Sequence, residues 1–287
     1  MPNVPRSPEA ALPRGFLRGK SAANNVFSGA FVSDYAIYPS LKGMPVIISG
    51  GASGIGEGIV RAFAEQGSKV GFVDIASEAG DKLAAELNAA GATVRFTRCD
   101  VTDIAAYQAA IKGFEAAHGP ALALVNNAAN DHRHDIAEIT PEDWDQRIAV
   151  NLKHAFFAAQ AVAPGMIAAK RGSIINFGSV SWMTLSAQLT VYTAAKAAMH
   201  GMSRSMAKEY GKHGVRANTL VPGWIMTERQ LSLWATPEAL EALDQQQALA
   251  GRLYPEDIAR MVLFLAADDS KMISGQDFLV DGGWAHG

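Results

Sequence analysis

From residue 45 onward, short apolar runs alternate with longer, alanine-rich amphipathic stretches. Seven runs have the length of buried strands: Val46–Ile48, Val70–Val73, Thr93–Phe96, Leu122–Val125, Ser173–Phe177, Arg216–Val221 and Phe278–Val280. Helical periodicity fills the intervals, most clearly around 141–170, 190–211 and 255–267. Strands that alternate with helices of this length are typical of βαβ units. The pattern therefore predicts an α/β protein, doubly wound, with about seven parallel strands and helices on both faces.

Residues 1–40 differ from the rest of the chain. They are rich in Pro, Ser, Ala, Asn and Gly and show no sustained apolar period. We interpret them as an N-terminal extension or arm. The remaining residues, 41–287, have enough apolar content for one large core, because 49% of the 287-residue chain is hydrophobic. The sequence thus predicts an arm followed by a single domain.

The charges narrow the range of partners. The formal net charge is -3 and the signs alternate along the chain, so no basic stripe for nucleic acid or for an anionic membrane is present. No apolar run has the length of a transmembrane span or the position of a secretory signal. The single cysteine, Cys99, cannot form an internal disulfide. We expect a cytoplasmic protein that acts on a small molecule.

A glycine-rich turn directly follows the first predicted strand. It runs from Ser49 to Gly56 and leads into a helix-like stretch at 57–66. Its glycines at positions 50, 54 and 56 allow a tight turn and a close approach of the backbone to a pyrophosphate at the helix N-terminus. Such a turn alone also fits an ordinary strand-to-helix loop. Its place after a strand and before a helix favours a Rossmann-type dinucleotide site.

Asp74 supports the same interpretation. It ends the second predicted strand, about 20 residues beyond the glycines, where a carboxylate accepts hydrogen bonds from the adenosine ribose. A carboxylate at this point repels a 2′-phosphate, and no Arg or Lys is present among the next residues, Ile75 to Ser77. The sequence therefore predicts NAD rather than NADP as the cofactor.

Two residues in a later helical stretch indicate proton chemistry. Tyr192 and Lys196 are four positions apart and share one helix face. Lowering the pKa of a tyrosine from about 10 to about 7 requires roughly 4 kcal/mol, which a cation about 4 Å away supplies at an effective dielectric constant of 20. Ser179 lies thirteen residues before Tyr192, after the fifth predicted strand, and can hold the reacting oxygen; Ser181 offers the same chemistry nearby.

With these motifs in place, the chain resembles the short-chain dehydrogenase/reductase family from Leu41 to Gly283. The family's cofactor turn corresponds to Ser49 through Gly56, with Ser49 where Thr is usual. Its Asn-Asn-Ala-Gly segment corresponds to Asn126 through Ala129, in which Ala129 replaces a glycine and disfavours a positive φ.

The resemblance implies roles for further residues. Asn151 is expected to support a proton relay from Lys196, and the Asp281 segment is expected to pack in a homotetramer. The candidate catalytic residues are Asn151, Ser179, Tyr192 and Lys196. The candidate cofactor-binding residues are Gly50, Ser53, Gly54, Ile55, Gly56, Asp74, Asp100, Val101, Asn127, Ala128, Tyr192, Lys196, Pro222, Gly223, Ile225 and Thr227.

The wider sequence is similar to the bacterial aldose 1-dehydrogenases, which implies oxidation of the C1 hydroxyl of a sugar to a lactone. Polar groups and flat rings in the predicted crevice loops suit the polar edges and the C–H face of a sugar. The candidate substrate residues are Asn130, Asp131, Ser181, Trp182, Gln188 and Trp224. The acidic and histidine residues at 131–135 lack the spaced ligands of a closed metal site, so no metal is predicted.

Two alternatives stay open from the sequence. A carbonyl reductase of the 3-oxoacyl carrier-protein type shares the motifs, but Asp74 argues against the NADPH that such an enzyme prefers. A dinucleotide-sensing protein without turnover shares the fold, but it has no need of Tyr192 and Lys196.

Overall fold

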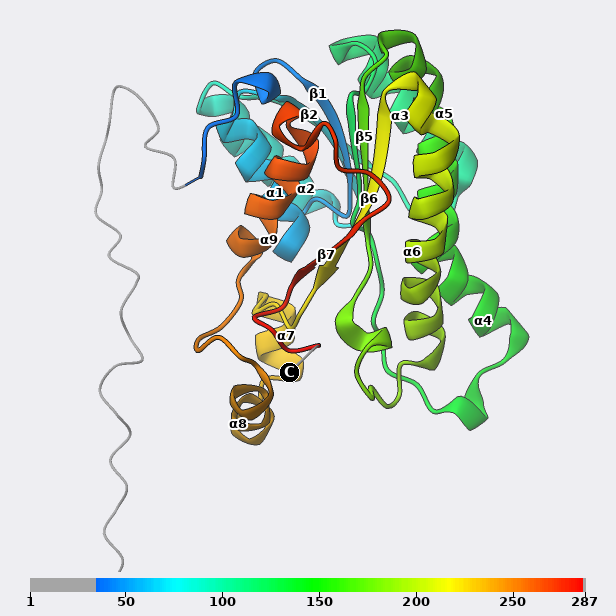
Figure 1. The fold of residues 1–287 in the computed structure, drawn as a ribbon, viewed down its shortest axis with the longest axis vertical. Helices are drawn as coiled ribbons and strands as arrows, with labels where there is room; N and C mark the ends of the chain where they lie inside the picture. Colours follow the sequence, from blue (N-terminus) through cyan, green and yellow to red (C-terminus); the bar gives the residue numbers. More distant parts are fainter. Residues whose placement is uncertain (1–34, 286–287) are drawn as a thin grey trace, which may run out of the picture. The chain divides into compact units, whose positions relative to one another are not determined.

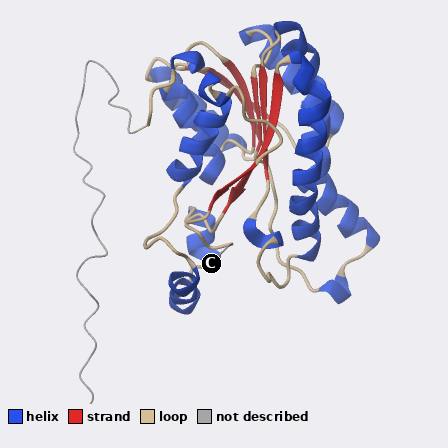
Figure 2. Cartoon of the chain, viewed as in Figure 1, coloured by secondary structure: helices blue, strands red, loops and turns tan. Residues whose placement is uncertain are grey.

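The computed structural model describes residues 35–285 and contains one sheet of seven parallel strands. The strands are β1 (Pro45–Ser49), β2 (Lys69–Asp74), β3 (Thr93–Arg98), β4 (Ala123–Asn126), β5 (Gly172–Phe177), β6 (Val215–Pro222) and β7 (Asp277–Val280). Their order is β3-β2-β1-β4-β5-β6-β7. The predicted doubly wound α/β architecture is therefore confirmed, and each predicted strand is present (Figures 1 and 2).

Helices cover both faces of the sheet (Figure 1). One layer contains α1 (Gly54–Glu65), α2 (Ser77–Ala89) and α9 (Pro255–Ala266), and the other contains α3 (Ile104–His118), α5 (His154–Ala169) and α6 (Thr190–Tyr210). Two further helices, α7 (Glu228–Leu233) and α8 (Pro237–Gln246), follow the carboxyl end of β6. No helix within residues 35–285 is both long and apolar enough to span a membrane.

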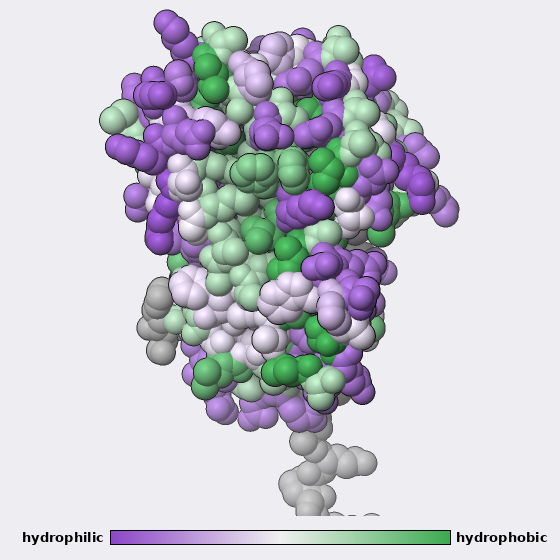
Figure 3. Space-filling view, turned by 90° about the vertical axis from the view of Figure 1, so that its right-hand side faces the viewer, coloured by the Kyte–Doolittle hydropathy of each residue, from purple (hydrophilic) through white to green (hydrophobic). Residues whose placement is uncertain are grey.

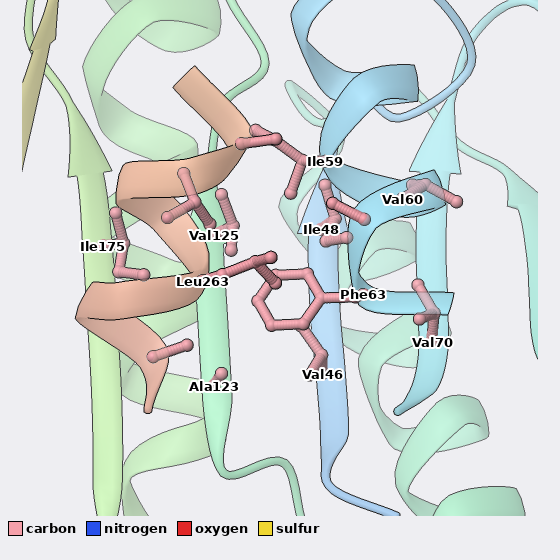
Figure 4. Close-up of a cluster of buried hydrophobic side chains, with 14 of the residues drawn as sticks. Val46, Ile48, Ile59, Val60, Phe63, Val70, Ala123, Val125, Ile175 and Leu263 are labelled. Carbon is pink, nitrogen blue, oxygen red and sulfur yellow. The ribbon is translucent and has the colours of Figure 1, made fainter. Parts of the chain in front are cut away.

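Each face of the sheet has its own hydrophobic core. Phe63 of α1 and Leu263 of α9 lie against Val46, Ile48 and Val125 of the central strands (Figure 4). All five side chains are at most 1% exposed. Because parallel strands are covered on both faces, their sequences are continuous apolar runs without polar alternation.

The helical stretch predicted at 141–170 is present and contains a π-helical turn. It consists of α4 (Pro141–Ile148), a π-helical turn (Ala149–Lys153) and α5. A capping box between Thr140 and Asp143 starts α4. The π turn inserts one extra residue, which apolar periodicity does not reveal, and such turns are frequent at functional sites.

A chain of buried polar side chains joins the sheet to α6. The Asn126 amide donates to Asn176 Oδ1 at 2.8 Å, and the Asn176 amide donates to Ser203 Oγ at 2.9 Å. Thr219 donates to the same hydroxyl at 2.9 Å. These bonds connect β4, β5 and β6 close to their carboxyl ends and fix how the strands align there.

Most of the predicted arm, residues 1–34, lies outside the described residues. Residues 35–40 contact the domain. Tyr35 and Tyr38 pack against the core on the α1 side. The Gln66 side chain accepts from Tyr38 N at 2.9 Å and donates to Ala36 O at 3.0 Å. The domain therefore includes residues from Tyr35 onward.

Candidate active site

A cleft of about 1960 Å³ opens over the carboxyl ends of the strands. Residues of the loops after β1, β2, β4, β5 and β6 line it. The strand order reverses direction between β1 and β4, and ligands of doubly wound sheets bind at such a point.

The glycine turn after β1 forms one wall of the cleft. Gly50 and Gly54 have positive φ angles of 69° and 56°. A Cβ atom on Gly56 would lie 1.7 Å from the carbonyl oxygen of Gly50, so only glycine fits there. Ser53 makes no side-chain cap to α1. The turn and this helix N-terminus fit a pyrophosphate, as the sequence predicts.

Asp74 lines the same wall and has a second role that the sequence does not reveal. Its carboxylate accepts hydrogen bonds from Ala52 N at 2.9 Å and from Ala76 N at 3.0 Å. Asp74 therefore holds the glycine turn in place while it presents its charge to the cleft.

The cation of α1 that lines the cleft, Arg61, already has acidic partners. Its guanidinium contacts Glu57 at 2.8 Å and Glu86 at 2.6 Å. Both carboxylates raise the pKa of Arg61. This arginine is therefore engaged within the protein.

The loops after β1 and β4 are joined by hydrogen bonds. Ser49 Oγ accepts from the backbone N–H groups of Asn127 and Ala128, each at 3.1 Å. The Asn127 side chain donates to Gly50 O at 2.9 Å. Serine thus keeps the hydroxyl of the usual threonine. Ala129 is not among the described residues that adopt positive φ, so the missing glycine causes no strain of that kind.

His154 also holds this loop, and sequence analysis missed it. It begins α5, is fully buried, and its Nε2 lies 3.1 Å from Ala128 O. Burial lowers the pKa of His154 to about 3, and the positive charge of Lys196 acts in the same direction. The ring is therefore neutral, and Nε2 donates to the carbonyl.

The three central catalytic candidates meet in the cleft. Ser179 follows β5, and Tyr192 and Lys196 belong to α6. Ser179 and Tyr192 form a side-chain hydrogen bond. Lys196 Nζ donates to Phe177 O at 2.9 Å and lies 5.6 Å from the centroid of the Tyr192 ring.

Burial dominates the titration of this group. It raises the pKa of Tyr192 to about 12, where the hydrogen bond to Ser179 acts in the opposite direction and the charge of Asp131 adds to the rise. Burial also lowers the pKa of Lys196 to about 7, opposed by Asp131. The sequence predicts that Lys196 lowers the pKa of Tyr192. In the protein without a bound cofactor, the effect of burial is larger and the pKa of Tyr192 is raised instead.

Asn151, the fourth catalytic candidate, is not among the residues that line the cleft. It is fully buried in the π turn. Its Oδ1 accepts from Asn130 N at 2.8 Å, and its amide donates to Asn130 O and Arg147 O, each at 3.0 Å. The side chain is thus fully engaged in holding the loop after β4.

Five of the six predicted substrate residues line the cleft, namely Asn130, Asp131, Ser181, Gln188 and Trp224. The Ser181 hydroxyl is buried and has no hydrogen-bond partner among the described residues. Trp182 does not line the cleft, in contrast to the sequence-based expectation. Its indole N–H donates to His200 Nε2 at 2.8 Å. The sequence gives no sign of this partner.

Asp131 connects two of the lining loops. Its carboxylate accepts from Arg229 at 3.0 Å and from Gln230 at 2.9 Å, both in α7. The Gln230 side chain also accepts from the Trp224 indole at 2.9 Å. Gln230, which sequence analysis missed, therefore connects two predicted substrate residues.

A second contact joins the same segments. The Arg133 guanidinium lies 4.4 Å from the centroid of a Trp234 ring.

Within residues 35–285, no group of three or more His, Cys, Asp or Glu side chains has an arrangement suitable for a metal ion.

The fold, the glycine turn and the Ser-Tyr-Lys group together define an oxidoreductase that uses a nicotinamide dinucleotide. A family model described as enoyl-(acyl carrier protein) reductase matches residues 50–285. The chain belongs to the short-chain dehydrogenase/reductase family, and it is an enzyme that acts on CH–OH groups.

Curated relatives include sugar dehydrogenases. The D-xylose 1-dehydrogenase of Caulobacter vibrioides is 46% identical over 87% of this chain and 98% of its own. The probable galactose dehydrogenase GalD of Rhizobium meliloti is 39% identical over 86% of this chain and 96% of its own.

Solved structures with the same fold hold either form of the cofactor. A 3-oxoacyl-[acyl-carrier protein] reductase from Brucella melitensis with bound NAD is 31% identical, with a TM-score of 0.79 over 88% of this chain and 94% of its own. A blue fluorescent protein from a metagenomic library, in complex with NADPH, is 33% identical, with a TM-score of 0.79 over 86% and 99%.

Proposed function

We propose that this enzyme oxidises the C1 hydroxyl of an aldose to a lactone with NAD as the oxidant. The observation that carries the proposal is that Ser179, Tyr192 and Lys196 line the same cleft as the glycine turn and Asp74. The aldose is suggested by the 46% identity to a D-xylose 1-dehydrogenase.

The choice of NAD rests on the charges of the glycine-turn wall. Asp74 presents a carboxylate where an adenosine ribose binds in Rossmann-type domains. Arg61 is held by Glu57 and Glu86, so it is not free to neutralise a 2′-phosphate. The residues expected to hold the cofactor are Gly50 and Gly56 at the pyrophosphate, Asp74 at the ribose, Asp100 and Val101 on the adenine side, and Ile225 and Thr227 at the carboxamide.

The oxidised nicotinamide ring, when bound, accepts a hydride and brings a positive charge into the cleft. Tyr192 takes the proton of the C1 hydroxyl, while Ser179 orients the oxygen through the hydroxyl that also contacts Tyr192. Lys196 would hold the nicotinamide ribose. When the Lys196 amine is protonated, its positive charge favours the phenolate form of Tyr192. The aldose loses one hydride and one proton, which balances a lactone, NADH and H⁺. Asn151 supports the proton relay by fixing the loop at Asn130.

A polyhydroxylated substrate suits the remaining cleft. Ser181 offers a buried hydroxyl without a partner, and Asn130 and Gln188 place further polar groups along the lining. An apolar alcohol leaves such groups unpaired, at about 1–3 kcal/mol each. Since Trp182 lies outside the lining, Trp224 is the remaining predicted ring that faces the substrate.

The test is a panel of pentoses, hexoses, simple secondary alcohols and 3-oxoacyl thioesters, followed by nicotinamide absorbance with NAD, NADP and their reduced forms. We expect the highest kcat/KM for an aldose with NAD. If a 3-oxoacyl thioester is the best substrate, the carbonyl reductase alternative replaces this proposal. Ser181→Ala, with Ser186→Ala as a control in the same lining, checks whether the unpartnered hydroxyl contributes to sugar affinity.

We further propose a homotetramer located in the cytoplasm. Figure 3 looks onto the side of α5 and α6, where hydrophobic residues gather along the middle and hydrophilic residues surround them. Phe156 of α5 is 46% exposed and forms an edge contact with Phe157. Burial of this surface between subunits is favourable. Light scattering after size exclusion tests the assembly, and Phe156→Asp is expected to weaken it.

A further inference from the structure

Four side chains form a line that runs from the loop after β5 to the edge of the sheet. The Trp182 indole donates to His200 Nε2 at 2.8 Å, and His200 Nδ1 lies 2.9 Å from Asp277 Oδ1. Asp277 Oδ2 accepts from Arg204 at 2.6 Å. The rings of Trp182 and His200 also meet edge to face, with centroids 4.8 Å apart. None of these contacts is part of the proposed proton transfer.

The donors and acceptors fix the state of His200. An indole N–H only donates, so His200 Nε2 must accept and its proton resides on Nδ1, facing Asp277. His200 is 5% exposed, while Trp182 is 39% exposed. His200 is therefore a buried imidazole that accepts one hydrogen bond, from a partly exposed indole. Its Nδ1 lies within ion-pair distance of Asp277 Oδ1 but makes no hydrogen bond within the described residues.

Trp182 is the last residue of the 3-10 turn Val180–Trp182 that begins beside Ser179. Ser179 Oγ caps this turn by accepting from Ser181 N at 3.2 Å. His200 belongs to α6, two turns beyond Tyr192. A single hydrogen bond thus connects the turn that orients Ser179 to the helix that carries Tyr192.

Gly178 shows how closely the two segments approach. A Cβ atom at this position would lie 2.8 Å from His200 Nε2, so a larger residue would displace the imidazole. Gly178 directly precedes Ser179 and follows β5. The backbone before the serine is therefore packed against the same histidine that holds the turn after it.

We propose that His200 is a positioning residue for the reaction: it accepts the Trp182 hydrogen bond and thereby sets the spacing between the Ser179 hydroxyl and the Tyr192 phenol. The negative charge of Asp277, 2.9 Å from Nδ1, favours the tautomer that carries its proton on this nitrogen. This inference rests on the proposed roles of Ser179 and Tyr192.

Trp182→Phe and His200→Leu test the contact, since the first removes the indole donor and the second removes the acceptor Nε2 together with the Nδ1 that lies beside Asp277. We expect each to lower kcat about tenfold while KM for NAD stays within about twofold, because misplaced reacting groups slow the chemical step. The double variant is expected to be no slower than either single one. His200→Gln, which restores an acceptor, is expected to recover most of kcat. Trp144→Phe, an exposed tryptophan of α4, is the matched control.

The pH dependence gives a readout that a purely structural role would not produce. Protonation of His200 places an N–H opposite the indole N–H and breaks the bond. The charged groups around the ring are Asp277 on β7, and Lys196 and Arg204 on α6. We expect kcat to show a second decrease toward acidic pH, in addition to the one that depends on Tyr192, and this second decrease to be missing from Trp182→Phe and His200→Gln. The difference in tryptophan fluorescence between the wild type and Trp182→Phe is expected to titrate over the same pH range.

The outcomes separate this inference from the proposed function. Losses in kcat below twofold, or losses that add in the double variant, overturn the positioning role of His200. A fluorescence difference that does not change with pH overturns the hydrogen bond. Ser179→Ala tests the proposed function separately. If this variant retains full kcat while the fluorescence difference titrates as expected, the proposed role of Ser179 is wrong. The positioning role of His200 is then also wrong, although the hydrogen bond between Trp182 and His200 is confirmed.

Discussion

Asp131 and Arg229 form an ion pair with an N–O distance of 3.0 Å between the loop after β4 and α7. The negative charge of Asp131 raises the pKa of both Tyr192 and Lys196. Arg229 partly cancels this charge as long as the pair is intact. The state of the pair therefore influences the pH at which Tyr192 accepts a proton.

The two members of the pair are expected to have opposite effects. Asp131→Asn removes the charge, so the alkaline rise of kcat should move to lower pH. Arg229→Gln leaves Asp131 uncompensated, so the rise should move to higher pH. Because the side chains are 31% and 45% exposed, their coupling in stability is expected to be only about 0.5 kcal/mol. pH–rate profiles check this prediction, and shifts in the same direction would contradict it.

Tyr192→Phe is expected to lower kcat by at least about 1000-fold, because it removes the only group proposed to take the substrate proton. The affinity for NAD, measured by calorimetry, should change little because the ring and its packing remain. Tyr210→Phe, at the end of the same helix, serves as the control. Activity near that of the wild type in Tyr192→Phe would refute the proposed mechanism.

Asp74→Asn separates the two roles of this residue. The amide keeps an acceptor for the turn at Ala52 but loses the charge that repels a 2′-phosphate. We expect the preference for NAD over NADP, as a ratio of kcat/KM values, to fall by about tenfold, or about 1.4 kcal/mol. Asp74→Ala should in addition weaken binding of both cofactors because the turn loses its anchor. An unchanged ratio in Asp74→Asn would rule out the ribose assignment.

His154 makes the fold sensitive to acid. Burial lowers the pKa of His154 in the folded state to about 3, below its ordinary value of 6.5, so the unfolded chain binds more protons between these two pH values. The stability that neutral His154 provides is complete above pH 6.5 and is lost as the pH falls toward 3, by at most about 5 kcal/mol. Denaturant titrations of His154→Gln should show a flatter pH profile over this range than those of His213→Gln.

We expect residues 1–34 to be dispensable for folding and residues 35–38 to matter. Deletion of residues 1–34 keeps Tyr35 and Tyr38 against the core and keeps both hydrogen bonds of Gln66. Deletion of residues 1–38 removes all of these contacts and should lower Tm by about 4 °C or more. Calorimetry of the two truncations decides the point, and equal Tm values would show that the contacts contribute nothing.

The strands and the glycine turn were predictable because each is encoded by neighbouring residues. Val46–Ile48 and the turn after it show their character within about ten positions. The break at 149–153 was not predictable, since one additional residue in a helix leaves the apolar period almost intact on either side. The predicted helical stretch at 141–170 is thus confirmed, because residues 141–169 are helical throughout, but the π turn inside it was not predicted.

The directions of side chains were less accessible to sequence analysis. Trp182 was expected over the substrate, yet its indole faces His200, whose own partner Asp277 lies 77 positions further along the chain. Gln230 was missed because a glutamine in a short helix carries no signature of its contacts with Asp131 and Trp224. Such contacts follow from the packing of distant loops, which periodicity does not encode.

The hydrogen-bonded chain from Asn126 through Asn176 and Ser203 to Thr219 has a consequence for protein engineering. These hydrogen bonds connect α6 with the strands β4, β5 and β6, and the cleft loops follow the carboxyl ends of these three strands. Those loops supply most of the residues assigned to the substrate, while the hydrogen-bonded side chains lie fully inside the sheet and α6. Segments 130–134, 184–189 and 228–234 are accordingly the ones that we propose to exchange with those of other family members in order to alter substrate recognition while these buried hydrogen bonds are retained.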